Sequence, residues 1–252
     1  MILILKSTLV RVLLLIVFLI GLVYAAIKLI DEFGNDHLRS KAYALAISLP
    51  GELPERFFDV VSIRNHQYHN PYKNESDNLK KIHDRILAIN PTRNITITEL
   101  VSLLAEGTNS DLDRLYSVYI WIISNIRYDS SAPIYQSAGD ALARRTAVCD
   151  GFSKLLSKLA RELNIPVIQI SGHANPPTDG IPNHAWNAAM IDGRWFLMDV
   201  TWDVGNIDFG ELQYFLTDPA QFNLSHRPLD EKWLLVENES HPQTNQILGY
   251  SR

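Results

Sequence analysis

The sequence has one cysteine, Cys149, among 252 residues. A single cysteine excludes an intramolecular disulfide and any zinc or redox site built on paired cysteines. The chain also lacks a lysine- and arginine-rich run outside its extreme N-terminus, and its formal net charge is −5. Nucleic-acid-binding proteins present clustered positive charge, so we expect no nucleic-acid partner. No cluster of metal-binding residues is evident in the sequence, and we expect neither a metal nor another cofactor.

What is present is an ordinary globular composition. Hydrophobic residues make up 46% of the chain and charged residues 20%. This length and composition suffice for one sizeable core and a smaller helical region. We predict four parts: a hydrophobic segment at 1–30, a helical region at 31–108, a domain that carries the chemistry at 109–238, and a C-terminal tail at 239–252.

The hydrophobic segment contains no charged residue from 12 to 27. Lys6 and Arg11 precede it, a charge order that predicts the N-terminus in the cytoplasm and the rest of the chain outside. Spanning a bilayer takes about 20 apolar residues, so a single transmembrane anchor is expected if flanking positions contribute. Small residues ending at Ala25 also fit a signal-peptidase site, which would give a secreted or periplasmic protein. Both readings place the body of the chain outside the cytoplasm.

The region 31–108 is expected to form helices joined by turns. Pro50-Gly51 breaks the chain, and the polar stretch 66–77 is typical of a loop. A short helix is expected from Thr98 to about Gly107. Before it, apolar residues recur at helical spacing: Leu79, Ile82, Ile86 and Leu87.

Two helices and an antiparallel sheet are expected after residue 109. One helix follows an N-cap at Ser110 or Asp111, and the other begins at Cys149 and ends before Pro166. Asp192-Gly193 between two hydrophobic runs is a strong hairpin signal. Strands are expected at 167–170, 184–191, 194–202 and about 212–216. One cysteine-bearing helix followed by such a sheet indicates an α+β fold.

Cys149 lies at the start of its expected helix. Backbone N–H groups are unpaired at that end and the helix dipole favours negative charge, so a thiolate nucleophile is favoured there. The alternative is a small buried hydrophobic residue, which is the commoner fate of a free cysteine. A buried cysteine would fit better near Leu155 or Leu159, one or two turns later.

The hairpin brings His184 and Asp199 together. If Asp192-Gly193 forms a two-residue turn, His184 faces Thr201 and Trp186 faces Asp199. All four side chains then project from one face of the sheet, with Asp199 the diagonal neighbour of His184. A carboxylate there can fix the imidazole tautomer and leave the other ring nitrogen for a thiol. A core histidine satisfied by a nearby aspartate is the alternative reading.

Several motifs between about residues 111 and 235 resemble a known family, the transglutaminase-like superfamily. They are Trp121-Ile122, Asn125-Ile126-Arg127-Tyr128-Asp129, Ala147-Val148-Cys149-Asp150-Gly151-Phe152, His184-Ala185-Trp186-Asn187, Asp192-Gly193-Arg194-Trp195 and Asp199-Val200-Thr201-Trp202-Asp203. Later motifs are similar to the kyphoscoliosis-peptidase and cytokinesis-associated branch: Tyr214-Phe215-Leu216, Asp218-Pro219, His226-Arg227-Pro228 and Trp233.

The resemblance implies a papain-like core with Cys149, His184 and Asp199 as its catalytic triad. It implies acyl transfer on protein or peptide amides, with hydrolysis (a protease or amidase) slightly favoured over cross-linking because water needs no dedicated acceptor site. The backbone N–H of Cys149 is expected to stabilise the oxyanion. Candidates for substrate contacts are Trp186, Gln136 and Tyr128.

Two other functions fit the same sequence. A catalytically inactive, membrane-tethered binding or scaffolding domain would keep the fold and leave the triad unused. Arylamine acetyl transfer on a similar core would require a coenzyme A site that the sequence does not reveal. Fold alone does not choose among these activities.

Overall fold

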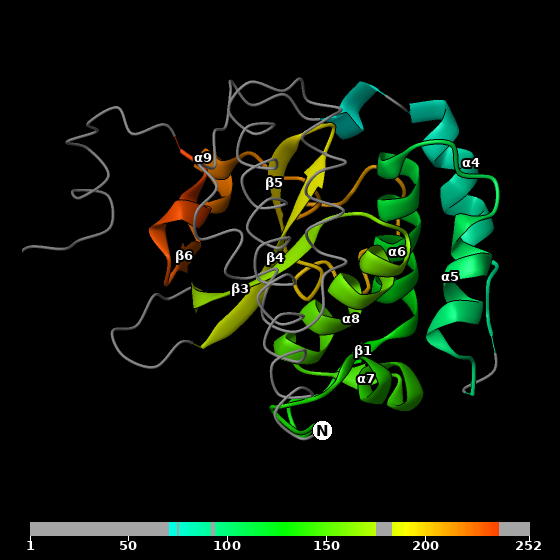
Figure 1. Cartoon of the computed structure of the whole chain (residues 1–252), viewed down its shortest axis with the longest axis horizontal. Coiled ribbons are helices and arrows are strands. Elements are labelled where there is room, and N and C mark those ends of the chain that lie inside the picture. Colours follow the sequence, from blue (N-terminus) through cyan, green and yellow to red (C-terminus); the bar gives the residue numbers. More distant parts are fainter. Residues whose placement is uncertain (1–70, 75, 92–93, 175–182, 237–252) are drawn as a thin grey trace, which may run out of the picture.

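The computed structural model describes residues 71–74, 76–91, 94–174 and 183–236 (Figure 1). The predicted hydrophobic segment, most of the expected helical region and the C-terminal tail lie outside these residues. Among the described helices, none is both long enough and apolar enough to cross a membrane.

Three layers follow one another across the described part of the chain (Figure 1). The first layer is a four-stranded antiparallel sheet in the order β5-β4-β3-β6, built from Val167–Ala174 (β3), His184–Ile191 (β4), Arg194–Met198 (β5) and His226–Pro228 (β6). Helices α6 (Asp111–Asn125) and α8 (Cys149–Glu162) form the next layer. Helices α4 (Ser76–Leu87) and α5 (Ile97–Ala105) pack outside α6. This mixed arrangement confirms the expected α+β class.

Short elements complete the described chain. A two-stranded parallel sheet pairs Arg127–Tyr128 (β1) with Thr146–Ala147 (β2), and α7 (Ala138–Arg144) lies beside it. Helix α9 (Pro219–Phe222) precedes β6. Two 3-10 helices flank these parts, η1 at Pro71–Asn74 and η2 at Glu231–Leu234.

The helix ends agree with their local sequence signals. Ser110 caps α6 by accepting a hydrogen bond from the backbone N–H of Asp113, and Thr96 forms a capping box with Glu99 at the start of α5. Helix α8 begins at Cys149 and ends at Glu162, and Asn164 follows with a positive φ of 58°. The predicted start and end of the cysteine-bearing helix are therefore confirmed.

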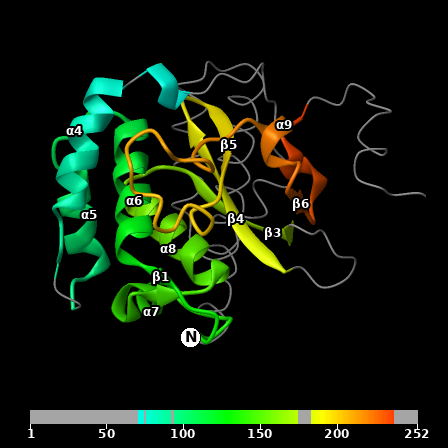
Figure 2. The same ribbon diagram turned by 180° about the vertical axis from the view of Figure 1, so that it is seen from behind.

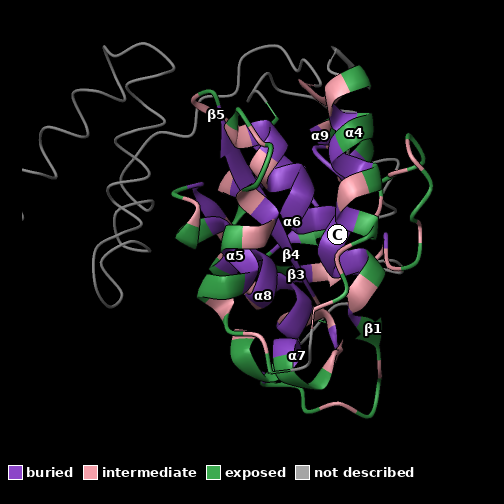
Figure 3. Ribbon diagram, turned by 90° about the vertical axis from the view of Figure 1, so that its right-hand side faces the viewer, coloured by how far each residue is buried: buried purple, intermediate pink, exposed green. Residues whose placement is uncertain are grey.

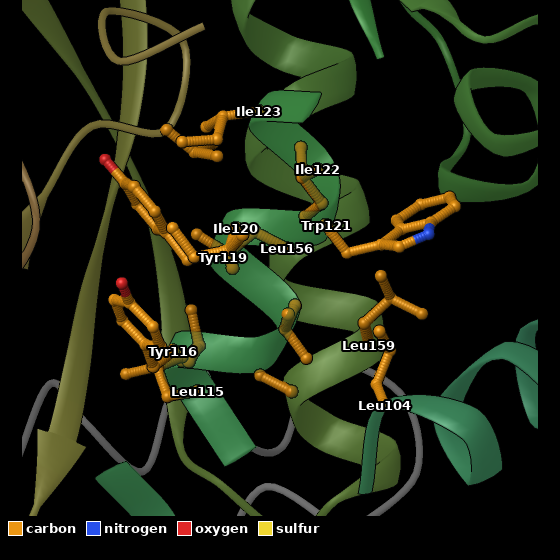
Figure 4. Packing of buried hydrophobic residues seen from close by; sticks show 14 of the residues in the cluster. Leu104, Leu115, Tyr116, Tyr119, Ile120, Trp121, Ile122, Ile123, Leu156 and Leu159 are labelled. Atoms are coloured by element: carbon orange, nitrogen blue, oxygen red, sulfur yellow. The ribbon is translucent and has the colours of Figure 1, made fainter. Parts of the chain in front are cut away.

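The main core lies where α6 meets α8 and the sheet. Tyr116, Tyr119 and Trp121 of α6 are fully buried, and Leu156 and Leu159 of α8 pack against that helix (Figure 4). Figure 3 shows buried residues running through α6, α8 and the central strands. Leu79, Ile86 and other apolar residues of α4 join this same core. Helices α4 and α5 thus share one hydrophobic core with the part of the chain that follows them.

The β4–β5 hairpin has the predicted turn but a shorter second strand. Ile191 pairs with Arg194, and Asp192 and Gly193 both have positive φ, 49° and 77°, as the predicted two-residue turn requires. The ladder ends at the pair Asn187–Met198. The predicted pairs of His184 with Thr201 and of Trp186 with Asp199 are therefore wrong.

The side chain of Asp199 explains this early end. Its Oδ1 atom accepts hydrogen bonds from the backbone N–H groups of Thr201 and Trp202, at 2.9 and 3.3 Å. These donors are therefore taken up by a local turn and do not extend the ladder. On the opposite edge of β4, His184 pairs with Gly172 of β3.

No strand forms at 212–216, which corrects the sequence prediction. The carboxylate of Asp203 accepts the backbone N–H groups of Gln213 and Tyr214, at 3.1 and 2.9 Å. A single bridge between Leu197 and Thr217 is the remaining β-type pairing there. The segment from 199 to 218 instead crosses the side of α6 irregularly (Figure 2), and Tyr119 of α6 donates a hydrogen bond to Asp203.

Gly172 allows β6 to lie close to the sheet. A Cβ atom at this position would collide with the carbonyl oxygen of Arg227 and with the ring of Trp186. We expect Gly172→Ala to destabilise the fold by about 1–3 kcal/mol, because backbone would have to move. Urea denaturation measures the change. Gly139→Ala in α7 is the matched control: its Cβ would lie 3.7 Å from the nearest atom, so it should be neutral or slightly stabilising. Equal stability of both variants would contradict the expectation.

Candidate active site

Cys149 is the first residue of α8, and its side chain is partly exposed. Val148 occupies the N-cap position and provides no side-chain hydrogen bond to the helix start. Backbone N–H groups in the first turn of a helix point outward and favour an anion when no side chain caps them. The thiol therefore lies at an end of the helix that favours a thiolate.

His184 is the first residue of β4, and its ring is held by Asp199. Its Nε2 atom lies 2.6 Å from Oδ2 of Asp199, and its side chain is 8% exposed. Since Nε2 faces the carboxylate, Nδ1 is the ring nitrogen left for another partner. Cys149 is also close enough to the same ring to influence its pKa. The structure thus brings His184 and Asp199 into contact, and the place of Cys149 in the triad stays a prediction.

These neighbours determine the charge of His184. Burial alone disfavours the imidazolium, but the hydrogen bond that the ring donates to Asp199, the interaction with Cys149 and the charges of both groups outweigh burial and raise the pKa of His184 to about 9. The ring is therefore protonated at neutral pH. An imidazolium beside a thiol is the arrangement that stabilises a thiolate nucleophile.

Asp199 is fully buried and accepts four hydrogen bonds. Oδ1 takes the two backbone donors of the turn, while Oδ2 lies within hydrogen-bond distance of two histidines, His184 and His226. Burial would raise the pKa of Asp199, but the bonds and charges of the two histidines outweigh it and lower the pKa. The side chain is therefore an ionised carboxylate, and four hydrogen-bond donors stabilise its negative charge.

The predicted substrate-contacting residues lie in different environments. Trp186 is 1% exposed and packs behind His184, with ring centroids 6.0 Å apart. Gln136 is also buried, and its Nε2 donates a hydrogen bond to the carbonyl of Thr146 at 3.2 Å. Tyr128 is 49% exposed, and burial, together with the charge of Cys149, raises its pKa. Tyr128 is therefore the one of these three that offers a substantial exposed surface beside the thiol.

Gln136 also approaches the first turn of α8. A Cβ atom on Gly151 would lie 2.7 Å from Oε1 of Gln136, and this oxygen has no hydrogen-bond partner among the described residues. Glycine at 151 therefore leaves space for the glutamine side chain against the helix start. The atom nearest the helix start is an acceptor, and Nε2 donates to Thr146, so this arrangement does not support Gln136 as an oxyanion donor.

His226 is a member of this site that sequence reasoning did not single out. In the sequence, this residue stands out only as part of a family motif, because a three-residue strand is too short to show a periodic pattern. Its Nε2 atom lies 3.0 Å from Oδ2 of Asp199, and its side chain is fully buried. The signal available in the sequence was the motif His226-Arg227-Pro228 itself.

His184, Asp199 and His226 also carry the atom types that bind metals, within 4.8 Å of one another. The contacts of 2.6 and 3.0 Å to the shared carboxylate oxygen are hydrogen-bond lengths. A zinc ion with bonds of about 2.0–2.2 Å in tetrahedral geometry would hold its ligand atoms more than about 3 Å apart. As arranged, the three side chains form a hydrogen-bonded group.

Comparison with known proteins agrees with this geometry. Residues 98–200 match the family model of the Transglutaminase-like superfamily.

Among curated proteins, the chain is similar to the kyphoscoliosis peptidase of Mus musculus, with 32% identity over 162 residues, and to that of Homo sapiens, with 31% identity over 173 residues. The matches cover 56% and 60% of this chain but 24% and 26% of the relatives, so the chain spans about a quarter of their length. The predicted resemblance to this branch is confirmed. A solved structure of a protein suggested to be a cysteine protease from Cytophaga hutchinsonii is 27% identical, with a TM-score of 0.36; the match covers 52% of this chain and 44% of that one.

Proposed function

We propose that the chain is a cysteine enzyme that transfers the acyl group of protein or peptide amides, using Cys149, His184 and Asp199. The observation that carries the proposal is the position of His184. Its ring bonds to a buried carboxylate at 2.6 Å on one side and has the thiol at a helix start as its other neighbour. The match of residues 98–200 to the Transglutaminase-like superfamily supports a cysteine-based reaction.

In this mechanism, the Cys149 sulfur attacks the amide carbonyl carbon and forms a carbon–sulfur bond. The backbone N–H of Cys149 stabilises the oxygen anion that develops. The His184 imidazolium then donates its proton to the nitrogen of the leaving amine, and the carbon–nitrogen bond breaks. Asp199 holds the ring in the orientation that this transfer requires.

The acyl–enzyme is resolved when a second nucleophile attacks the thioester. His184 accepts the proton of that nucleophile, and the thiolate leaves. Water yields a hydrolysed product, and a lysine amine yields a cross-link. We favour hydrolysis, because water needs no acceptor site, and we place the reaction on a protein or peptide substrate.

The experiment that tests the proposal supplies both acceptors at once. The full chain is incubated with a glutamine-containing protein and a fluorescent primary amine, and ammonia, amine incorporation and cleaved fragments are measured. Hydrolysis predicts fragments or ammonia without incorporation, and cross-linking predicts incorporation with ammonia release. If none of these products forms from any of several unrelated protein substrates, the enzyme assignment is contradicted.

A non-catalytic scaffolding domain is the alternative, and the reactivity of the thiol distinguishes the two. In the native enzyme, Cys149 should react with iodoacetamide faster than in the urea-unfolded chain, and His184→Ala should lower the native rate at pH 7 by tenfold or more. The single cysteine makes the labelling site unambiguous. Slow labelling that is unchanged in the His184 variant would favour the scaffold.

We also propose that the enzyme works outside the cytoplasm, anchored by its N-terminal hydrophobic segment. The support is the charge order around residues 12–27. A membrane-impermeant maleimide should then label Cys149 in intact cells that express the full chain. Labelling only after the cells are lysed would contradict this location.

A further inference from the structure

His226 reaches the site through an element outside the predicted hairpin. Strand β6 pairs with β3, placing Ala174 opposite His226 and Gly172 opposite Pro228. Gly172 also pairs with His184 on its other side. The two histidines therefore come from strands on opposite edges of β3, and they converge on the carboxylate of Asp199.

Both ring nitrogens of His226 have fixed partners. Nδ1 lies 2.9 Å from the hydroxyl of Ser225, and Nε2 lies 3.0 Å from Oδ2 of Asp199. A carboxylate accepts hydrogen bonds, so Nε2 carries a proton, and the serine hydroxyl donates to Nδ1 of a neutral ring. Burial outweighs the effect of Asp199 and lowers the pKa of His226, which agrees with the neutral form.

The surroundings of His226 are otherwise aromatic. Its ring stacks on Phe222 with centroids 4.1 Å apart, and Trp202 and Trp186 lie at 4.4 and 5.0 Å. A phenylalanine would satisfy this packing without the cost of burying two polar nitrogens. Packing alone therefore does not explain why a histidine occupies this position. The hydrogen bond to Asp199 does.

We propose that His226 is a positioning residue: its neutral ring donates a hydrogen bond to Oδ2 of Asp199 and keeps that carboxylate ionised and directed at His184. This inference rests on the proposed function and deepens it. Asp199 has two donors on Oδ1 from its own turn, which fix one oxygen. His226 is the second donor on the other oxygen, the one that meets His184. Without it, the carboxylate would be freer to rotate or to take up a proton.

Two variants of the full chain separate hydrogen bonding from packing. His226→Phe keeps an aromatic ring and removes the donor, whereas His226→Gln loses the ring and retains an N–H donor near the position of Nε2. The measured quantity is the rate constant for alkylation of Cys149 by iodoacetamide between pH 5 and 10. Thermal unfolding of each variant shows whether it is folded.

We expect His226→Phe to react about tenfold to a hundredfold more slowly at pH 7, the range for losing a hydrogen bond to a charged group. The dependence of its rate on pH should also change, because Asp199 is no longer held by this donor. His226→Gln should retain most of the native rate and profile. A native rate in His226→Phe, or equal losses in both variants, would overturn the proposal.

The same assay separates failure of this inference from failure of the proposed function. If native Cys149 in the unaltered chain reacts no faster than in urea, the enzyme assignment fails. If it reacts fast and His226→Phe does not change it, only the positioning role fails. Should phenylalanine prevent folding, Ser225→Ala removes the donor that fixes the ring tautomer. It should slow alkylation in the same direction, and an unchanged rate there would equally overturn the proposal.

Discussion

Replacing Cys149 by alanine should lower turnover of an amide substrate by at least about a thousandfold, because the reaction loses its nucleophile. No second cysteine can substitute for it. A second effect is specific to this geometry: the thiol is one of the groups that raise the pKa of His184 to about 9, so the pKa should fall in the variant. Activity assays measure the first effect, and NMR titration of the imidazole measures the second.

Each of the two measurements tests a separate claim and can contradict it without the other. Residual turnover near the native level would place the chemistry on another group. A His184 pKa that is unchanged in Cys149→Ala would show that the sulfur does not interact with the ring in solution. Cys149→Ser is the matched control, since its hydroxyl keeps a hydrogen-bonding group of similar size while lacking the reactivity of a thiolate.

Replacing Asp199 by asparagine should also be severe. We expect a loss of turnover of about a thousandfold or more, because the ring of His184 loses the charge that fixes its tautomer and stabilises its protonated form. Burial, which lowers the pKa of His184, would then be opposed mainly by the thiol. The high-pH limb of activity, expected near pH 9 in the native enzyme, should move to lower pH.

The raised pKa of His184 in the native chain also affects its stability. The folded-state pKa of His184 is raised from 6.5 to about 9, so the stabilisation from its protonated form is complete below pH 6.5 and is lost as the pH rises through 9. Urea midpoints at pH 6 and pH 9.5 should therefore differ more in the native chain than in Asp199→Asn. Asp203→Asn is the control, since Asp203 is equally buried but bonds to Tyr119 and to backbone donors. It should lower stability and leave the high-pH limb in place.

Much of the site could be predicted because its signals are local. Asp192-Gly193 defines the hairpin turn, and the apolar spacing after Cys149 defines the helix that this residue begins. The motifs on either side of this turn place His184 and Asp199 on neighbouring segments. These features depend on residues close together in sequence, where turn chemistry and periodicity are informative.

The remaining features depend on side chains that compete with regular structure. Asp199 and Asp203 each bind two backbone N–H groups, and this ends β5 early and prevents a strand at 212–216. Hydrophobic alternation cannot reveal such competition, because it depends on where each carboxylate lies in the folded chain. The position of His226 depends on pairing between β3 and β6, which are distant in sequence.

The pairing of β6 with β3 affects how the molecule can be shortened for study. The stretch shared with the superfamily ends at residue 200, and it includes Cys149, His184 and Asp199. A recombinant fragment cut there would lose β6 and leave part of the β3 edge without its backbone partners, a surface prone to aggregation. It would also lose Trp233, whose ring packs edge-on against Trp195 at 5.1 Å. Soluble fragments for crystallisation should therefore extend beyond Leu235.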